Sequence, residues 1–270
     1  MERPAWAPHG IDLSVPSVSR MYDYYLGGSH NFEADRVAAR KVLDAFPGLP
    51  KIVQANRAFM RRAVRHAISE GVTRFLDIGS GIPTFGNVHE VAREASPEAR
   101  VVYVDNDPVA VAHSTAVVRD IEGVEIVAAD FRDPAALLAT EPVQHLLAPN
   151  RPVAVLLVAL LHFMDDEDKP YERVAEFRDA LPRGSMLVLS HASTDGGPAT
   201  TEQGEEVSEV YRRGGSTFVM RSFEEIARFF EGYELVEPGL VALPDWRPEG
   251  PVDEEDPIVY SGFVGVGRTA

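Results

Sequence analysis

The sequence has no cysteine, relatively few basic residues and no long apolar segment. Without cysteine among its 270 residues, the chain has no disulfides or thiolate metal sites, and we expect a protein of the reducing cytoplasm. The longest apolar run, residues 153–161, is shorter than the roughly 20 residues that cross a bilayer, so we expect no membrane association. The 26 Lys and Arg against 42 Asp and Glu give a formal net charge of −16. We therefore expect no nucleic-acid partner, which would need clustered basic residues.

The length and the order of the sequence patterns predict one compact unit with additions. A chain of 270 residues can bury one sizeable core. Residues 1–16 are rich in proline, and this composition predicts an N-terminal arm that lies over the surface. Apolar residues then recur at helical spacing through residues 17–70, and we expect these helices to cover the functional site. Residues 71–270 should form the ligand-binding domain, packed together with the helices.

A short apolar strand followed by a glycine-rich turn lies at residues 75–91, in the sequence FLDIGSGIPTFGNVHEV. Asp77, Gly79 and Gly81 form the pattern D-x-G-x-G, in which the glycines allow the backbone to turn tightly and to approach a ligand. An acid two residues before the first glycine suits a ligand with an ammonium group, which S-adenosylmethionine (SAM) has and a dinucleotide lacks. Ordinary tight turns also show this pattern, so its interpretation depends on the strands that follow.

The second apolar strand also ends in an acid, at the position where ligands bind in a parallel sheet. In VVYVDND, residues 101–107, Asp105 follows the last glycine of the motif by 24 residues. This spacing is close to that at which a strand-end acid binds a ribose diol. The alternative is that Asp105, Asn106 or Asp107 caps the helix that begins at Pro108.

The third strand, VEIVAAD at residues 124–130, ends in Asp130 and is followed by Phe131. In this class of fold, the end of that strand lies beside the adenine of the ligand. We therefore expect Asp130 to accept a hydrogen bond from the exocyclic amine, and Phe131 to pack on the adenine ring. Three strands that each end in an acid indicate one site at their carboxyl ends.

Two histidines lie at the ends of the next two predicted strands. The apolar run 153–164 predicts a central strand buried on both faces, with His162 near its end, and residues 185–191 predict a strand that ends at His191. Both side chains are candidates for contact with SAM or a substrate in one crevice, and the alternative is a structural, hydrogen-bonded role. Residues 192–217 are polar and rich in glycine, which predicts either a mobile lid or an ordinary surface loop. We find no spacing typical of metal ligands.

The alternation of strands and helices predicts a doubly wound α/β fold that binds ligands at the carboxyl ends of its strands. Two β-like segments, residues 235–243 and 258–266, close the chain, and we expect the last strand to insert antiparallel at the sheet edge. The predicted fold is therefore a Rossmann-like sheet of the class I methyltransferase type. It should be mostly parallel, with seven strands and N-terminal helical additions.

The sequence also resembles a bacterial family of SAM-dependent methyltransferases that was long classified as a domain of unknown function. The resemblance covers nearly the whole chain, and its distinctive blocks are RMYDYYLGGSHNFEADR (20–36), QANRAF (54–59), FLDIGSGIPTFGNVHEVA (75–92), VVYVDNDPVAVAH (101–113), PVAVLLVALLHFMDDED (152–168) and LVLSHAS (187–193). Compared with SAM methyltransferases in general, Pro83 replaces the third glycine of the turn. Proline suits the first turn of a helix.

The resemblance implies SAM as the cofactor and suggests roles that the chemistry also supports. Asp77 and the backbone of Gly79 and Gly81 would hold the amino-acid tail of SAM. Arg57 would bind the tail carboxylate, although a solvated surface position suits Arg57 equally well. The other expected contacts are Asp105 at the ribose with Asn106 beside it, Asp130 and Phe131 at the adenine, and Tyr22 and Asn31 closing the site from above.

We therefore expect a SAM-dependent methyltransferase that acts on a small-molecule acceptor. Methyl transfer is an in-line displacement in which the protein mainly aligns the reactants. A base such as His162 or His191 is needed only if the acceptor is a hydroxyl or a protonated amine.

Two alternatives stay open at this point. An NAD(P)-dependent oxidoreductase would also use a glycine turn and a strand-end acid. Against it, Thr84 occupies the last position of G-x-G-x-x-G. A non-catalytic SAM-binding module would keep the cofactor site and have no acceptor pocket.

Overall fold

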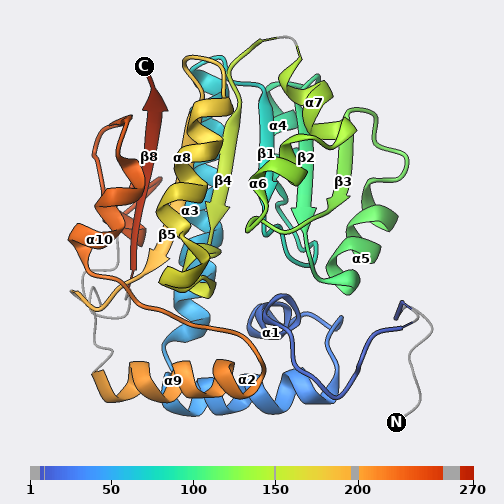
Figure 1. Ribbon diagram of the computed structural model, residues 1–270, viewed down its shortest axis with the longest axis vertical. Helices are drawn as coiled ribbons and strands as arrows, with labels where there is room; N and C mark the ends of the chain where they lie inside the picture. Colours follow the sequence, from blue (N-terminus) through green and yellow to red (C-terminus); the bar gives the residue numbers. More distant parts are fainter. Residues whose placement is uncertain (1–6, 9, 149, 196–200, 252–261) are drawn as a thin grey trace.

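A computed structural model describes residues 7, 8, 10–148, 150–195, 201–251 and 262–270 (Figure 1). In this part of the chain, eight strands form one sheet in the order β3-β2-β1-β4-β5-β8-β6, with β7 paired to β8. The strands are β1 (Arg74–Ile78), β2 (Arg100–Asp105), β3 (Val124–Ala128), β4 (Ala154–Val158), β5 (Met186–Ala192), β6 (Tyr233–Leu235), β7 (Val241–Ala242) and β8 (Gly262–Thr269).

The first five strands are parallel, and β8 runs antiparallel to β5, β6 and β7. This confirms a mostly parallel sheet whose last strand is antiparallel. The described chain has eight strands, not seven, because the predicted segment 235–243 does not form one strand. Pro238 cannot donate a ladder hydrogen bond, and Gly239 has a φ of 94°, so the chain turns between β6 and β7. In the other predicted segment, residues 258–261 lie outside the described part of the chain.

The central strand β4 ends at Val158, well before the end at residue 164 that the sequence predicts. Ala159 has a φ of 57° and turns the chain away from the sheet, and Leu161–Phe163 then form a 3-10 helix. Leu161 is nevertheless fully buried in the core. The apolar run therefore reports burial but not strand length, and His162 lies on the turn that follows the strand.

Helices cover both faces of the parallel strands (Figure 1). Alternate residues of β1 divide between two core clusters, with Phe75 in the first and Leu76 and Ile78 in the second. The helices that contribute to the first cluster are α3 (Leu49–Ser69), α4 (Val88–Ala95) and α5 (Pro108–Val118). Those that contribute to the second are α6 (Pro134–Leu138), α7 (Glu141–Leu147), α8 (Pro170–Ala180) and α10 (Phe223–Ala227). This arrangement confirms the doubly wound architecture.

A further layer of helices lies at the carboxyl ends of the parallel strands (Figure 1). It contains α1 (Val18–Tyr25), α2 (Glu33–Ala45) and α9 (Thr201–Arg213). α9 lies beside α2, and Val207 and Tyr211 of α9 are buried in one cluster with Met21 of α1. The segment 192–217 thus contributes a packed helix to this layer.

The N-terminal segment is joined to the sheet through packing and buried ion pairs. Ala7 of the predicted arm lies in one apolar cluster with Val109 of α5. The buried Arg20 of α1 pairs with Asp35 of α2 at 3.0 Å and with Asp107, just before α5, at 3.6 Å. These contacts hold α1 over the strand ends. None of the described helices is long and apolar enough to cross a membrane.

Candidate functional site

A cavity of about 440 Å³ lies between the carboxyl ends of the parallel strands and the start of α1. This volume falls within the roughly 300–1,000 Å³ of typical small-molecule sites. Its lining includes five of the residues singled out in the sequence, which are Gly79, Asp105, Asn106, Asp130 and Phe131. Ser17 and Ser19 at the start of α1 and residues 215–217 after α9 also line it. The strand-end acids of β2 and β3 therefore share one cavity.

Asp105 ends β2 and is buried beside the glycine turn. Its Oδ2 accepts a hydrogen bond from the Gly81 N–H at 2.8 Å, and its Oδ1 accepts one from the Asp107 N–H at 2.8 Å. Burial raises the pKa of Asp105 to about 6, although these two hydrogen bonds act in the opposite direction. The cap of α5 is Asp107, whose Oδ1 accepts from the Val109 N–H at 2.7 Å. The capping alternative for Asp105 was therefore wrong.

Asp77 and Arg57 line a second, much narrower space beside the glycine turn. Asp77 is only 9% exposed. Burial raises the pKa of Asp77 to about 7, the positive charge of Arg57 lowers it, and the negative charge of Asp105 raises it. Arg57 comes from α3, and its Nη2 donates to the Gly86 carbonyl at 3.3 Å. A buried carboxylate and a cation thus meet next to the turn.

The same narrow space contains a polar group that the sequence interpretation overlooked. The hydroxyl of Ser80 is buried and has no hydrogen-bond partner within the described residues. Ser80 lies between the two glycines of the D-x-G-x-G motif, and this position was the available signal in the sequence.

The two glycines of the motif have different roles. Gly79 and Gly81 have φ values of 71° and 68°, in the region that favours glycine. A Cβ on Gly79 would lie 2.7 Å from Leu160 Cδ1, so Gly79 allows close packing against the turn after β4. A Cβ on Gly81 would meet no atom within 4 Å. Gly81 therefore leaves open space that a ligand can occupy.

Asp130 follows β3 and lies in a network with two neighbours. Its carboxylate accepts from Asn106 Nδ2 at 2.9 Å and from the Arg132 N–H at 2.9 Å, and it pairs with the Arg132 guanidinium at 3.1 Å. Burial raises the pKa of Asp130, but these hydrogen bonds and the Arg132 charge outweigh burial, so that the pKa is lowered from its usual value. Arg132, which also pairs with Asp168 at 3.0 Å, was not singled out in the sequence.

The side chains of Phe131 and Asn31 have other partners. The ring of Phe131 stacks on that of Phe177 of α8, with centroids 5.2 Å apart. One face of the Phe131 ring is therefore covered, although the residue lines the cavity. Asn31 does not line the cavity. Its Nδ2 donates to Asp23 Oδ2 at 2.7 Å and to the Gly28 carbonyl at 3.0 Å, which fixes the turn between α1 and α2.

A smaller cavity of about 90 Å³ adjoins the first, because Ala159 and Phe163 line both. Tyr22, His162 and His191 are among the other residues that line it. The ring centroids of the two histidines are 5.5 Å apart, so both face one crevice. Tyr22 therefore lies in this second cavity and not in the larger one.

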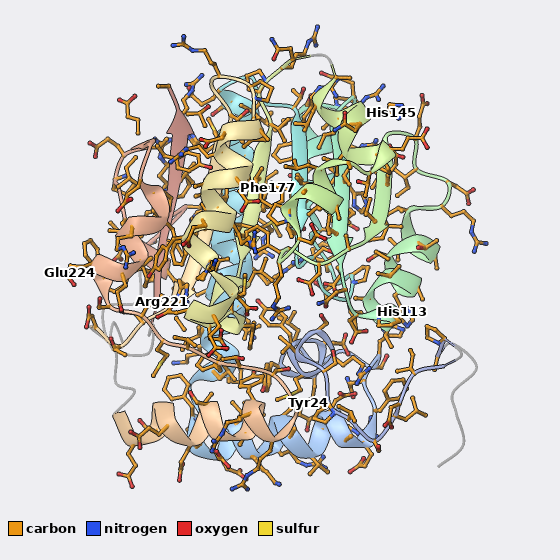
Figure 2. All side chains as sticks on the ribbon, in the orientation of Figure 1. Tyr24, His113, His145, Phe177, Arg221 and Glu224 are labelled. Carbon is orange, nitrogen blue, oxygen red and sulfur yellow. The ribbon has the colours of Figure 1, made fainter. Side chains whose placement is uncertain are left out.

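His191 is hydrogen-bonded through both ring nitrogens. Its Nδ1 donates to the Ala192 carbonyl at 2.6 Å, and its Nε2 accepts from Arg221 Nη1 at 3.0 Å. Burial lowers the pKa of His191 to about 3, so the ring is neutral. Arg221, labelled in Figure 2, is 2% exposed and also donates to the carbonyls of Leu161 and Met164. This arrangement favours a structural role for His191, whose arginine partner could not be recognised from the sequence.

His162 has fewer partners. Its Nδ1 accepts a hydrogen bond of 3.4 Å from the Ala192 N–H, which is long for such a bond. Burial, together with the neighbouring His191 and Arg221, lowers the pKa of His162 well below its usual value. The ring is therefore neutral as well.

Comparison with protein families identifies the chain. Residues 4–270 match the profile of a family described as S-adenosyl methyltransferase. The chain belongs to this family. The match confirms the resemblance found in the sequence, and it decides in favour of a SAM-dependent methyltransferase and against the oxidoreductase alternative. Among curated proteins, none matches the chain.

Solved structures with the same fold agree with the family assignment of this methyltransferase. A candidate methyltransferase from Thermobifida fusca YX is 39% identical, and the alignment covers 98% of this chain and 99% of that one with a TM-score of 0.91. A DUF574 family protein from Streptomyces avermitilis MA-4680 is 36% identical, with 96% and 99% covered and a TM-score of 0.90.

A more distant structure shares the class I methyltransferase fold alone. The 1,6-didemethyltoxoflavin-N1-methyltransferase of Burkholderia thailandensis was solved with 1,6-didemethyltoxoflavin and S-adenosylhomocysteine bound. It is 17% identical to this methyltransferase, with 82% of each chain covered and a TM-score of 0.50.

Proposed function

We propose that this methyltransferase binds SAM in the cavity of about 440 Å³ and transfers a methyl group to a small-molecule acceptor in the adjoining cavity of about 90 Å³. The observation that carries the proposal is the meeting of two buried carboxylates, Asp77 and Asp105, with Arg57 at the glycine turn. SAM has a sulfonium, an ammonium and a carboxylate, and so offers cations to the acids and an anion to the arginine. The pyrophosphate of a dinucleotide would face Asp77 with like charge.

The side chains beside the glycine turn offer partners for the amino-acid tail of SAM, and the space of about 10 Å³ between them would widen to admit it. Asp77 would accept from the ammonium group, and Arg57 would pair with the tail carboxylate. The hydroxyl of Ser80 supports this placement, because a buried polar group without a partner costs about 1–3 kcal/mol and the tail would supply one. The open side of Gly81 leaves room for the bound molecule.

Asp105 would hold the ribose of SAM. Its Oδ2 is oriented by the Gly81 N–H, and Ser19 Oγ lies 3.4 Å from its Oδ1. A ribose hydroxyl would donate to the same carboxylate in place of the serine hydroxyl. The cavity side of the Asp105 carboxylate can therefore accept a hydrogen bond from a hydroxyl group.

The strand end after β3 would hold the adenine. Asp130 would accept from the exocyclic amine, with Asn106 and Arg132 keeping its carboxylate ionised and in place. Phe131 lines the cavity although it is only 4% exposed, and its ring edge would contact the adenine.

Alignment is the main contribution of the chain to catalysis. Bound SAM supplies a methyl group that its sulfonium already activates, so no metal or second cofactor is needed for the transfer. Ala159 and Phe163 line both cavities, and the nucleophile would meet the methyl group at this boundary. Tyr22 would close the acceptor side, whereas Asn31 would act only by fixing the turn that carries α1. The small second cavity favours a small molecule over a macromolecular acceptor.

His162 is a better candidate than His191 for a base, if the acceptor needs one. Both nitrogens of His191 already have partners, whereas His162 is neutral and has only one long hydrogen bond. General-base catalysis contributes typically about 10²–10⁴-fold. With a hydroxyl acceptor, His162→Gln should therefore lower kcat by at least ~100-fold. An unchanged kcat would mean that proximity alone accounts for the rate.

Calorimetric titration with SAM, S-adenosylhomocysteine, NAD and NADP tests the cofactor proposal. We expect binding of the first two ligands only. Asp105→Ala should weaken SAM binding by ~100-fold, since two charge-assisted hydrogen bonds are worth about 3 kcal/mol or more, and the circular dichroism spectrum should not change. Asp120→Ala, which removes an exposed carboxylate at the end of α5, is the matched control. Equal SAM affinity in the two variants would remove the ribose assignment.

A structure with SAM bound would test the remaining alternative. We expect the acceptor cavity to stay open beside the methyl group. Side chains that close this cavity in the complex would instead favour a SAM-binding module without catalysis.

A further inference from the structure

The walls of the cavity of about 90 Å³ are aromatic and aliphatic. The ring of Tyr211 stacks near that of Phe218, with centroids 5.3 Å apart at 18°, and lies 5.2 Å from that of Phe163. A cavity of about 70 Å³ adjoins this one, since Tyr211, Phe218 and Ile52 are among the residues that line both. The two spaces together form an aromatic-walled chamber beside the cofactor cavity.

The chamber carries no charge next to the cofactor cavity. Among the described residues that line the cavity of about 90 Å³, none is Asp, Glu, Lys or Arg. Burial lowers the pKa of His191 to about 3 and that of His162 well below its usual value, so neither histidine is a cation at neutral pH. A charged molecule would lose its hydration here and find no counter-charge, which is costly.

Tyr22 and Ser190 are two of the residues that bring polar groups to the cavity of about 90 Å³. Tyr22 Oη accepts from Asn56 Nδ2 at 3.1 Å, so its own proton is available for a ligand. Burial raises the pKa of Tyr22, although the hydrogen bond from Asn56 and the charge of Arg57 act against this effect, so Tyr22 keeps its proton. At the boundary, Ser190 Oγ accepts from the Ala159 N–H at 2.8 Å.

We propose that the methyl acceptor is a flat, uncharged aromatic molecule with a hydroxyl group, an inference that rests on the proposed methyltransferase function. The ring would pack among Phe163, Tyr211 and Phe218, since aromatic rings prefer such offset and edge contacts. The hydroxyl oxygen would accept from Tyr22 and point toward the cofactor cavity. A cavity that holds benzene measures roughly 150 Å³, so the acceptor ring would extend from the cavity of about 90 Å³ into that of about 70 Å³.

The transfer balances with groups already present. The acceptor oxygen uses a lone pair to form the new bond to the methyl carbon, and the bond between that carbon and sulfur breaks with its electron pair staying on sulfur. The hydroxyl proton passes to Nδ1 of the neutral His162, the ring nitrogen that carries the lone pair, where it replaces the long hydrogen bond from the Ala192 N–H, and then to solvent. The products are the methyl ether and S-adenosylhomocysteine.

Three probes with the same two-ring carbon skeleton separate the effects of flatness and charge on binding. These are 2-naphthol, which is flat, neutral and hydroxylated, 2-naphthoate, which is flat and charged, and decahydro-2-naphthol, which is neutral and hydroxylated but not flat. Each probe is titrated calorimetrically into the full-length protein saturated with S-adenosylhomocysteine at pH 7. We expect 2-naphthol to bind at least ~10-fold more tightly than either analogue, because a difference of 1.4 kcal/mol in aromatic contact or desolvation gives this factor.

One aromatic substitution and a matched control locate the binding site. Phe218→Ala should weaken 2-naphthol binding by ~10-fold. Phe223→Ala, which removes a partly exposed ring outside the chamber, should leave it unchanged. Both variants should bind S-adenosylhomocysteine like the parent protein. A variant that loses S-adenosylhomocysteine binding is replaced by the milder Phe218→Leu, for which the same selective loss is expected.

The outcomes distinguish the two levels of the proposal. Failure of the parent protein to bind S-adenosylhomocysteine would overturn the proposed function and this inference together. Normal binding of S-adenosylhomocysteine with equal or tighter binding of 2-naphthoate, or with no effect of either Phe218 substitution, would overturn the acceptor class alone. Binding of 2-naphthol in preference to its two analogues, together with weaker binding in the Phe218 variant, would support the proposed function and the acceptor class.

Discussion

Replacing Asp77 by asparagine should stabilise the free protein and at the same time weaken SAM binding. Burial raises the pKa of Asp77 from 3.8 to about 7, and the unfolded chain keeps the ordinary value. The contribution of Asp77 to stability is therefore fully present below about pH 4 and is lost as the pH rises through about 7. Asparagine has nearly the same shape and carries no charge at any of these pH values. Its advantage should accordingly grow with pH.

The expected gain in free energy of unfolding on replacing Asp77 by asparagine follows from the difference between the pKa of Asp77 in the folded protein and in the unfolded chain. Linkage gives about 1 kcal/mol at pH 4.5 and about 4 kcal/mol at pH 8 for a group shifted this far. Urea unfolding of both proteins at the two pH values measures it as a difference in free energy of unfolding. Calorimetry of the same samples should show SAM affinity lowered by roughly 10- to 150-fold, because a hydrogen bond to a charged group contributes about 1.5–3 kcal/mol.

A matched substitution should change stability in the opposite direction. The pKa of Asp130 is lowered, since its hydrogen bonds and the Arg132 charge outweigh burial. Asp130→Asn should therefore destabilise the protein at pH 8, and this effect should disappear as the carboxyl protonates at low pH. The reasoning fails if Asp77→Asn destabilises the protein at pH 8, or if its advantage does not depend on pH. Either result would mean that partners hold the Asp77 carboxylate in its ionised form.

Three further predictions follow from the contacts of the site. SAM affinity should fall by ~16-fold between pH 7.5 and pH 6, as Asp77 and Asp105 protonate in the free protein with pKa values of about 7 and about 6. A titration series in calorimetry would contradict this if the affinity stayed flat. Arg20→Met should cost about 3–5 kcal/mol in urea unfolding, because it leaves buried acids without their cation. The exposed Arg40→Met should cost less than ~1 kcal/mol, and equal costs would refute the argument. Gly79→Ala should destabilise the protein more than Gly81→Ala in urea unfolding, since only the Cβ added at Gly79 meets a neighbouring side chain. Gly81→Ala should instead lower SAM affinity more than its small effect on stability would explain.

Much of the sheet could be predicted because its strands are buried on both faces. Apolar runs locate β1, β2 and β5, and each of these strands ends close to the expected acid or histidine. The edge strand β3 includes the exposed residues Glu125 and Ala128, and the acid that follows it marks its end. β4 shows the limit of this reasoning. Its apolar run continues through Leu161, which is buried after the chain has left the sheet, so hydrophobicity could not locate the end of the strand.

The site could be predicted only where local sequence determines it. The glycine motif and the strand ends gave Gly79, Gly81 and Asp105, which lie at one end of the sheet because parallel strands align their carboxyl ends. Whether Asp105 or Asp107 capped α5 depended on backbone geometry that the residue types did not distinguish. Arg221 was missed for another reason. It comes from a distant part of the chain, and its contact with His191 exists only through tertiary packing.

The N-terminal helices change the chemistry of an otherwise ordinary strand-end site. Ser19 of α1 and Arg57 of α3 lie against the acids of β1 and β2, and burial is the largest cause of the raised pKa values of Asp77 and Asp105. At the open end of a parallel sheet, water would solvate such acids and keep their pKa values low. Here burial makes their ionisation less favourable than in water, most of all for Asp77. The same burial that lowers the stability of the free protein would therefore increase its preference for a cationic ligand over a neutral one, which is why α1 and α3 belong to the cofactor site as much as the glycine turn does.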